Sequence, residues 1–274
     1  MSIFKLQQFS VKQTTSGMKV CSDSLLFGAV IPVIKARRAL DIGTGTGILS
    51  LMLAQKGHED IDCSLHSITA VELMQEAALE AQDNFQNSPW PDQLEVIQQD
   101  IQQFSRDHKN KNNDGYDLII SNPPFFVDQS KTSNDKPLRH VARHSDHLSF
   151  KDLCQSMDRL LTESGSVYLL LPLISIADLC TAALDIGLQL IEQIDIAESA
   201  DHPVKVSILH LVRKSTLDKR EISHTRLNKF TLPNVHSDEV QNLLAIFYAK
   251  LHFQEHFYTL HPQAPLYDQL SISL

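Results

Sequence analysis

The sequence predicts an α/β fold in which a mostly parallel sheet is covered by helices on both faces. Short apolar strands such as 37–43 and 67–73 alternate with helical segments such as 48–56 and 75–86. The strands are nearly continuous runs of Ile, Leu and Val, which is typical of strands that are buried on both faces. Strand–helix alternation with strands of this kind indicates a parallel sheet between two layers of helices.

Seven strands are expected, and no internal repeat interrupts them. The expected strands are 37–43, 67–73, 94–100, 116–121, 166–172, 188–199 and 204–214. The expected helices are 48–56, 75–86, 149–165 and 174–187, the third ending at a C-cap glycine, Gly165. No helix separates the last two strands, so we predict an antiparallel hairpin at one edge of the sheet. The polar stretch 105–115 is expected to be a loop.

Length and composition bound the possible functions. A chain of 274 residues accommodates one large domain, which we divide into an extension (1–35), a core (36–214) and a C-terminal segment with one helix and a tail (215–274). A net charge of −9 argues against non-specific coating of nucleic acid, although a local basic patch remains possible. No apolar run is long enough to cross a bilayer, and the N-terminus does not resemble a secretory signal.

The four cysteines are scattered along the chain and form no CxxC pair. This pattern indicates reduced core thiols of a cytoplasmic protein and neither a disulfide framework nor a zinc site.

The first strand ends in the motif DIGTGTG, residues 41–47. Gly43, Gly45 and Gly47 allow a tight turn in which the backbone approaches a ligand without a Cβ atom in the way. The spacing is GxGxG, and Ile48 occupies the position of the last glycine of the dinucleotide fingerprint GxGxxG. Ligands of open α/β sheets bind beyond the carboxyl ends of the strands, where this turn is expected. A plain strand–helix connection is the alternative.

Acidic residues follow the next two strands. Glu72 is placed to accept hydrogen bonds from both hydroxyls of a ribose, and Asp100 to accept one from an adenine amino group. Each residue also has a simpler interpretation. Glu72 could be a glutamate at the start of a helix, and Asp100 could be an N-cap or a loop aspartate.

The fourth strand runs into SNPPFF, residues 121–126. Proline fixes the backbone at Pro123 and keeps Asn122 extended, so the Asn122 side-chain oxygen and the Pro123 carbonyl are held in place. Two fixed acceptors can hold both hydrogens of a planar amino group while Phe125 stacks on the ring that carries it. They would direct the nitrogen lone pair at an electrophile by positioning and preorganised polarity, without a strong base.

A cluster of cations lies a few residues further on, in 131–147. Its cations are Lys131, Lys136, Arg139 and Arg143. A solvated loop is the simple interpretation, and we prefer a basic flap that contacts substrate phosphates. His140 and His144 have a metal-like spacing, but no H-E-x-x-H frame is present, so no metal is expected.

Together these motifs resemble a class I S-adenosylmethionine-dependent methyltransferase with a Rossmann-like fold, of the branch marked by (D/N/S)PP(Y/F/W). Bacterial tRNA1(Val) adenine-N6 methyltransferases, which modify the adenosine next to the anticodon, are the more specific resemblance. It rests on FSVKQTTSGMKVCSDSLLFGA (9–29), NPPFF, RHVARHSDHLSFKDL (139–153) and FYAKLHF (247–253). The tail after residue 253 extends beyond where such enzymes are expected to stop.

The resemblance implies a role for each matching position. Gly43, Gly45 and Gly47 would hold the methionine part of S-adenosylmethionine, and Asp41 would accept from its ammonium group. Glu72 and Asp100 would take the ribose and the adenine, and Lys19 and Asp23 would close over the cofactor. An ordinary surface charge and a helix N-cap are the alternatives for Lys19 and Asp23. The extension 1–35 is expected to pack on the cofactor site.

The resemblance also assigns the catalytic turn and the substrate contacts. The catalytic turn is Asn122, Pro123, Pro124 and Phe125, with Asn122 also near the cofactor. The expected substrate contacts are Phe125, Phe126, Lys136, Arg139 and Arg143. The expected reaction is methylation of adenine N6 in tRNA, in the cytoplasm, by a chain that is expected to be monomeric.

Three alternatives remain open. Guanine N2 of ribosomal RNA or a protein glutamine could be the acceptor, because enzymes acting on them also use NPP turns. A nicotinamide-dependent oxidoreductase is disfavoured by Ile48 and gives NPPFF no role. An RNA-binding module with an inert cofactor fold is disfavoured because every expected catalytic position is filled.

Overall fold

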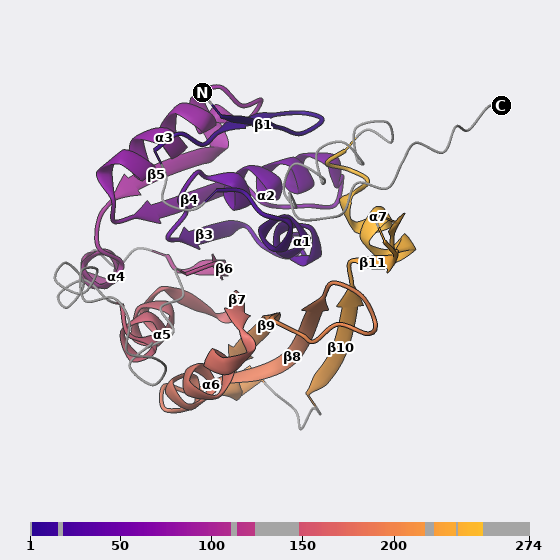
Figure 1. The fold of residues 1–274 in the computed structure, drawn as a ribbon. Coiled ribbons are helices and arrows are strands. Elements are labelled where there is room, and N and C mark those ends of the chain that lie inside the picture. The colour runs from indigo at the N-terminus through magenta and orange to yellow at the C-terminus, as the bar shows by residue number, and fades with distance from the viewer. Residues whose placement is uncertain are drawn as a thin grey trace, which may run out of the picture.

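A computed structural model describes residues 2–15, 19–110, 114–123, 148–216, 222–233 and 235–248. Within these residues the chain forms a central sheet with helices on both faces (Figure 1). The strand order of this sheet is β10-β8-β9-β7-β6-β3-β4-β5. Its strands are β3 (Arg38–Ile42), β4 (Ser67–Glu72), β5 (Leu94–Gln98), β6 (Tyr116–Ser121), β7 (Leu161–Pro172), β8 (Leu188–Ala197), β9 (Val206–Arg213) and β10 (Ser223–Asn228).

All neighbouring strands of the sheet run parallel except β9, which is antiparallel to both β7 and β8. The carboxyl ends of β3, β4, β5 and β6 therefore meet at one edge of the sheet. This confirms the predicted fold class and places the predicted site at that edge.

Each face of the sheet has its own apolar core. One core includes residues of α1 (Ser22–Val30), α2 (Ile48–Glu59), α3 (Gln75–Gln86) and α7 (Asp238–Leu244). The other includes residues of α4 (Ile101–Asn110), α5 (Phe150–Leu160) and α6 (Ile176–Leu184). Short 3₁₀ turns lie at Pro91–Gln93, Leu173–Ser175 and Lys214–Thr216. In the part of the chain that the structure describes, no helix could span a bilayer.

Two small hairpins flank the sheet. β1 (Ile3–Lys5) pairs with β2 (Ser10–Lys12), and β11 (Phe230–Leu232) pairs with β12 (Val235–His236). The first hairpin meets the end of the described chain, because the Gln7 amide donates to the Phe247 carbonyl at 2.8 Å. The same apolar core contains residues from both ends, Phe4 and Phe247 among them.

The expectation of a loop over 105–115 was wrong for residues 105–110, which belong to α4. The buried positions Ile101, Phe104, Ser105 and His108 follow helical spacing, i, i+3, i+4 and i+7. Two of these four residues are polar. An apolar pattern therefore missed a helix whose buried stripe includes a serine and a histidine.

Gly165 does not end a helix, contrary to expectation. The helix α5 ends at Leu160, and Leu161 is already extended and pairs with Tyr116. Gly165 lies within β7, where the pairing with β6 shifts register between Tyr116 and Leu118. A Cβ atom at Gly165 would come within 2.6 Å of the Leu161 side chain, so this irregularity requires a glycine.

The sheet has eight strands within the described residues and not the seven expected. β8 and β9 form the predicted antiparallel pair, but β10 adds to β8 in parallel, so the pair does not lie at the edge. Most side chains of β10 are exposed, and its sequence SHTRLN lacks the apolar run by which the other strands were recognised. All four cysteines are free, but only Cys154 is buried, so the prediction of core thiols does not hold for Cys21, Cys63 and Cys180, which are half-buried.

Candidate active site

Strand register brings the predicted site residues to one edge. Ile42 at the end of β3 pairs with Val71 of β4 and with Ser121 of β6. The Ser121 hydroxyl donates to the Ile42 carbonyl at 2.7 Å, so the two strand ends are joined by a side chain as well as by the sheet. The glycine turn therefore lies between Glu72 on one side and Asn122 on the other.

The three glycines of the turn have two different roles. All have positive φ, 72° at Gly43, 57° at Gly45 and 82° at Gly47, which side-chain-bearing residues rarely adopt. A Cβ atom at Gly43 or Gly45 would meet nothing within 4 Å, whereas one at Gly47 would lie 2.4 Å from the ring of Phe85. The first two glycines thus leave open space for a ligand, and the third is required by packing against α3.

Asp41 is fully buried beneath the turn. Its Oδ2 atom accepts hydrogen bonds from the hydroxyls of Thr44 at 2.6 Å and Ser50 at 2.8 Å. Burial raises the pKa of Asp41 to about 6, although these two hydrogen bonds act in the opposite direction. Among the described residues no donor reaches its buried Oδ1 atom, so this carboxylate can accept a further hydrogen bond.

Glu72 holds the glycine turn directly. Its Oε2 atom accepts from the Gly45 amide at 2.9 Å, and its Oε1 atom accepts from the Met74 amide, also at 2.9 Å. The residue is 8% exposed, at the end of β4. Glu72 therefore lies beside the glycine turn, as ribose binding requires. It also makes the contact at the start of α3 that was the alternative interpretation.

Asp100 caps α4. Its Oδ1 atom accepts from the Gln103 amide at 2.9 Å, and its carbonyl accepts from the Phe104 amide at 2.8 Å. The residue is half-buried, just beyond the end of β5. The cap uses one carboxylate oxygen, so it is compatible with a ligand contact through the other.

The predicted catalytic turn begins where β6 ends. Asn122 and Pro123 are half-buried and follow directly on the residue that is bonded to Ile42. Several predicted residues lie outside the described ones: Pro124, Phe125, Phe126, Lys131, Lys136, Arg139, Arg143, His140 and His144. The described ranges contain no group of three or more side chains arranged to hold a metal ion.

Lys19 and Asp23 lie on the N-terminal side of the site. The Lys19 side chain is exposed. The carboxylate of Asp23, at the start of α1, pairs at 2.7 Å with Lys229, which also pairs with Glu198 at 2.8 Å. Burial alone would lower the pKa of Lys229, but Asp23 and Glu198 outweigh it and raise the pKa. Asp23 thus joins α1 to the end of β10.

Sequence reasoning missed several residues that hold the site together. Thr44, Ser50 and Ser121 bond to Asp41 or to the end of β3. Two residues of α3 contact the end of the first hairpin and the residues that follow it, as described below. A polar residue inside an apolar strand, such as Ser121 in YDLIIS, is a sequence signal that could have been used.

The arrangement fits S-adenosylmethionine. The open glycine turn suits close backbone approach, Oδ1 of Asp41 can accept from an ammonium group, and a carboxylate stands at the end of β4.

Comparison with known proteins agrees with this fit. Residues 14–150 match the model of the methyltransferase small domain. The tRNA1(Val) (adenine(37)-N6)-methyltransferase of Cytophaga hutchinsonii is 41% identical over 218 residues, covering 78% of this chain and 84% of the relative. The enzyme of the same name from Bacteroides fragilis is 34% identical over 249 residues, covering 90% of this chain and 98% of the relative.

Solved structures share the fold at low sequence identity. A predicted O-methyltransferase of Agrobacterium tumefaciens superposes with a TM-score of 0.61 at 16% identity, covering 83% of this chain and 97% of that one. A putative class I S-adenosylmethionine-dependent methyltransferase of Listeria monocytogenes superposes with a TM-score of 0.52 at 17% identity, covering 85% of this chain and 68% of that one. The chain therefore belongs to the tRNA1(Val) (adenine(37)-N6)-methyltransferase family and is an S-adenosylmethionine-dependent methyltransferase.

Proposed function

We propose that this enzyme methylates N6 of an adenosine in tRNA, the adenosine next to the anticodon of valine tRNA. The observation that carries the proposal is the Ser121–Ile42 hydrogen bond of 2.7 Å, which fixes the start of the Asn122–Pro123 turn beside the glycine turn. An amino group held at the former would lie next to a cofactor held at the latter. The names of the curated relatives support the choice of tRNA and of adenine.

S-adenosylmethionine supplies a methyl group on a positively charged sulfur. In our proposal Asp41 accepts from the ammonium group of the cofactor, Glu72 from its ribose and Asp100 from its adenine. Gly43 and Gly45 let the backbone come close to the methionine part. Lys19 is proposed to lie over the cofactor, and Asp23 to orient this side of the site through Lys229.

The chain's own contribution to transfer is to position the acceptor. The Asn122 side-chain oxygen and the Pro123 carbonyl accept the two amino hydrogens, and Phe125 stacks on the base. Fixed acceptors of this kind favour the geometry in which the nitrogen lone pair points at the methyl carbon. The target base must leave its stack, which costs least in a single-stranded loop, so an anticodon-loop adenosine suits this site.

The RNA contacts are proposed for the segment that holds Lys136, Arg139 and Arg143, with Phe126 beside the base. Such a local basic segment provides phosphate contacts to a chain with a net charge of −9. We place the enzyme in the cytoplasm, where its substrate would be, and propose that it acts as a monomer.

The decisive experiment is single-turnover methylation of tRNA by Asn122→Ala, followed by nucleoside mass spectrometry. Loss of one preorganised polar group should lower the rate by about 100-fold or more, while binding of S-adenosylhomocysteine survives. Asn87→Ala, which changes an exposed asparagine at the end of α3, is the matched control. A rate for Asn122→Ala close to that of the wild type would make the turn a strand terminator and refute the mechanism.

The acceptor is tested with total RNA from cells that lack the gene. Appearance of N6-methyladenosine in valine tRNA supports the proposal, whereas methylation of guanine N2 or of a protein glutamine assigns the enzyme to another substrate. For the basic segment, replacing Arg139 and Arg143 together should raise the KM for tRNA and flatten its salt dependence. An unchanged salt slope would return the segment to an ordinary solvated loop.

A further inference from the structure

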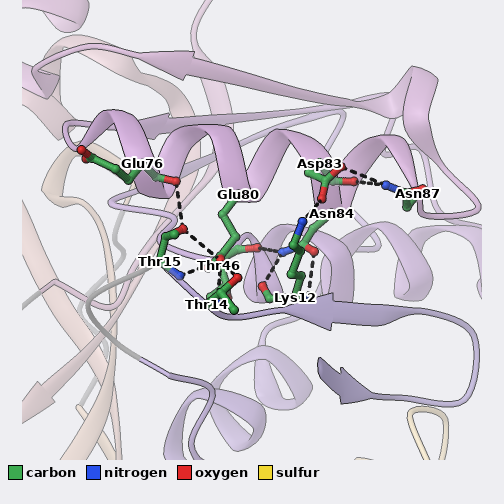
Figure 2. Close-up of polar contacts among 9 residues, drawn as sticks. All are labelled: Lys12, Thr14, Thr15, Thr46, Glu76, Glu80, Asp83, Asn84 and Asn87. Atoms are coloured by element: carbon green, nitrogen blue, oxygen red, sulfur yellow. Dashed lines mark hydrogen bonds and ion pairs between the residues drawn. The ribbon is translucent and has the colours of Figure 1, made fainter. Parts of the chain in front are cut away.

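The helix α3 holds the segment 12–15 through a buried carboxylate (Figure 2). Four donors converge on one oxygen of Glu80. The amide and hydroxyl of Thr14 lie 2.6 and 2.9 Å from Oε2, and those of Thr15 lie 2.8 and 3.0 Å from it. Glu80 is only 5% exposed. Its hydrogen bonds to two consecutive backbone amides fix the path of the chain at Thr14 and Thr15.

One turn further along α3, Asn84 joins three parts of the chain. Its Oδ1 atom accepts from the Lys12 amide at 2.8 Å, and its Nδ2 group donates to the Lys12 carbonyl at 2.9 Å. The same Nδ2 group donates to the carbonyl of Thr46, in the glycine turn, at 2.8 Å. A single buried amide thus connects the N-terminal segment to the cofactor turn.

The start of α3 is connected to the same turn. The Met74 amide donates to Glu72, and Glu72 accepts from the Gly45 amide. The helix therefore contacts the glycine turn directly through Asn84 at Thr46 and through the Phe85 ring beside Gly47, and its N-cap residue Met74 bonds to Glu72, which holds Gly45. A shift of α3 would move the turn and the N-terminal segment together.

The first hairpin does not depend on these contacts alone. The hairpin has other anchors, which are the edge-to-face contact of Phe9 with Trp90 at 5.9 Å and the hydrogen bond from Gln7 to Phe247. An apolar residue at position 80 would leave the amides and hydroxyls of Thr14 and Thr15 without their acceptor. The Glu80 carboxylate is therefore matched to these donors, and it holds the segment by hydrogen bonds rather than by apolar packing.

We propose that Glu80 and Asn84 are positioning residues that couple docking of the segment 12–15 to cofactor binding in the glycine turn. The inference rests on the cofactor position given in the proposed function. Coupling between two sites is reciprocal, so a docked segment favours the cofactor and a bound cofactor favours docking. Cofactor binding would thereby hold Lys12, Thr14 and Thr15 more firmly against α3.

Hydrogen exchange and calorimetry with S-adenosylhomocysteine test this coupling. The amides of Lys12, Thr14 and Thr15 donate to the two positioning residues, so their exchange reports docking directly. In the wild type, S-adenosylhomocysteine should slow exchange at these amides. In Asn84→Ala and Glu80→Ala that protection should shrink, and the dissociation constant should rise about tenfold, within the usual range of coupling between sites.

Kinetics separate positioning from a general loss of structure. The KM for S-adenosylmethionine should rise in both variants, whereas kcat at saturating cofactor should stay close to that of the wild type. Glu80→Gln retains an acceptor for the amides, so it should recover much of the affinity that Glu80→Ala loses. Asp83→Asn is the matched control on the same helix, because it removes the half-exposed ion pair of Asp83 with Lys12 and keeps an oxygen that can accept from Asn87.

The proposal is overturned if Asn84→Ala and Glu80→Ala lower the melting temperature but bind S-adenosylhomocysteine like the wild type. Glu72→Ala is measured in parallel. If it loses affinity while the α3 variants do not, only the coupling is wrong, whereas unchanged affinity in Glu72→Ala refutes the proposed cofactor position. Should Asn84→Ala not fold, Thr14→Val and Thr15→Val remove hydroxyl donors alone, and normal affinity in both overturns the proposal.

Discussion

Gly47 and Phe85 lie so close that a Cβ atom on the glycine would be 2.4 Å from the phenylalanine ring. The last glycine of the motif at the cofactor site is therefore fixed by the packing of α3 against the start of α2. Its neighbours Gly43 and Gly45 face open space. Glycines that look equivalent in the sequence should respond differently to substitution.

Gly47→Ala should destabilise the fold strongly. The alanine would be strained at a φ of 82° and would displace the Phe85 ring, and together these effects cost about 2–4 kcal/mol in the free energy of unfolding. Gly187→Ala is the control, since Gly187 has a φ of 79° with nothing within 4 Å and should cost about 1 kcal/mol. Urea denaturation measures both, and equal losses would show that Phe85 does not constrain the turn.

Gly45→Ala should fold but bind cofactor poorly. The open space around Gly45 limits the loss of stability to the strain of its positive φ, about 1–2 kcal/mol. The added methyl group would fill the space that the cofactor needs, so affinity for S-adenosylhomocysteine should fall at least tenfold, or about 1.4 kcal/mol. Calorimetry would contradict this if Gly45→Ala bound as tightly as Gly187→Ala.

Asp41 should make stability depend on pH. Its pKa is about 6 in the folded protein against 3.8 for an aspartate in an unfolded chain, so burial favours its protonated form in the fold. The stabilisation relative to an unperturbed aspartate is complete below pH 3.8 and is lost as the pH rises to about 6. The free energy of unfolding of Asp41→Asn, minus that of the wild type, should therefore rise by about 3 kcal/mol over this range. A difference that is constant with pH would refute the shift.

The same carboxyl should make cofactor binding depend on pH. An ammonium group beside Asp41 favours its ionised form, so binding releases a proton below pH 6. Affinity for S-adenosylhomocysteine should rise between pH 5 and 7 in the wild type and stay nearly flat in Asp41→Asn. Calorimetry in buffers of different ionisation enthalpy measures the proton released on binding. If no proton is released at pH 5.5, Asp41 does not accept from the ammonium group.

Lys229→Met should destabilise the joint between α1 and β10. The substitution leaves Asp23 and Glu198 without their shared, buried cation, and breaking a buried pair in this way costs about 3–5 kcal/mol. Lys12→Met is the control, because its ion pair with Asp83 is half-exposed and contributes less than about 1 kcal/mol. Thermal unfolding should separate the two variants clearly, and a Lys229→Met protein as stable as Lys12→Met would show that the joint is dispensable.

The sequence predicted those parts of the fold whose signal is local. The apolar run of β6 gave Tyr116–Ser121, and the periodic apolar positions of α3 gave Gln75–Gln86, both with the observed bounds. The order of strand ends followed from the alternation of elements, which placed the glycine turn and Glu72 at one edge. Strands such as β10 were missed because an exposed edge strand needs no apolar run.

Contacts between distant parts of the chain could not be predicted in this way. Glu80 has the sequence environment of an ordinary helix charge, and its partners Thr14 and Thr15 lie more than 60 residues away. Asp23 was expected over the cofactor, but its partner Lys229 is more than 200 residues further along the chain. A single sequence specifies residue types and local periodicity, while such pairings emerge only when the layers pack.

The hydrogen bond between Gln7 and Phe247 has a consequence for synthesis of the protein on the ribosome. The N-terminal hairpin and α1 emerge first, yet α1 packs against α7 and the hairpin bonds to Phe247, both of which emerge more than 200 residues later. A nascent chain that stops before α7 would contain every residue assigned to the cofactor but would leave the side of α1 that packs against α7 without its cover. Exposed apolar surface attracts chaperones and proteases. Prematurely terminated chains should therefore be degraded and should not accumulate as cofactor-binding fragments.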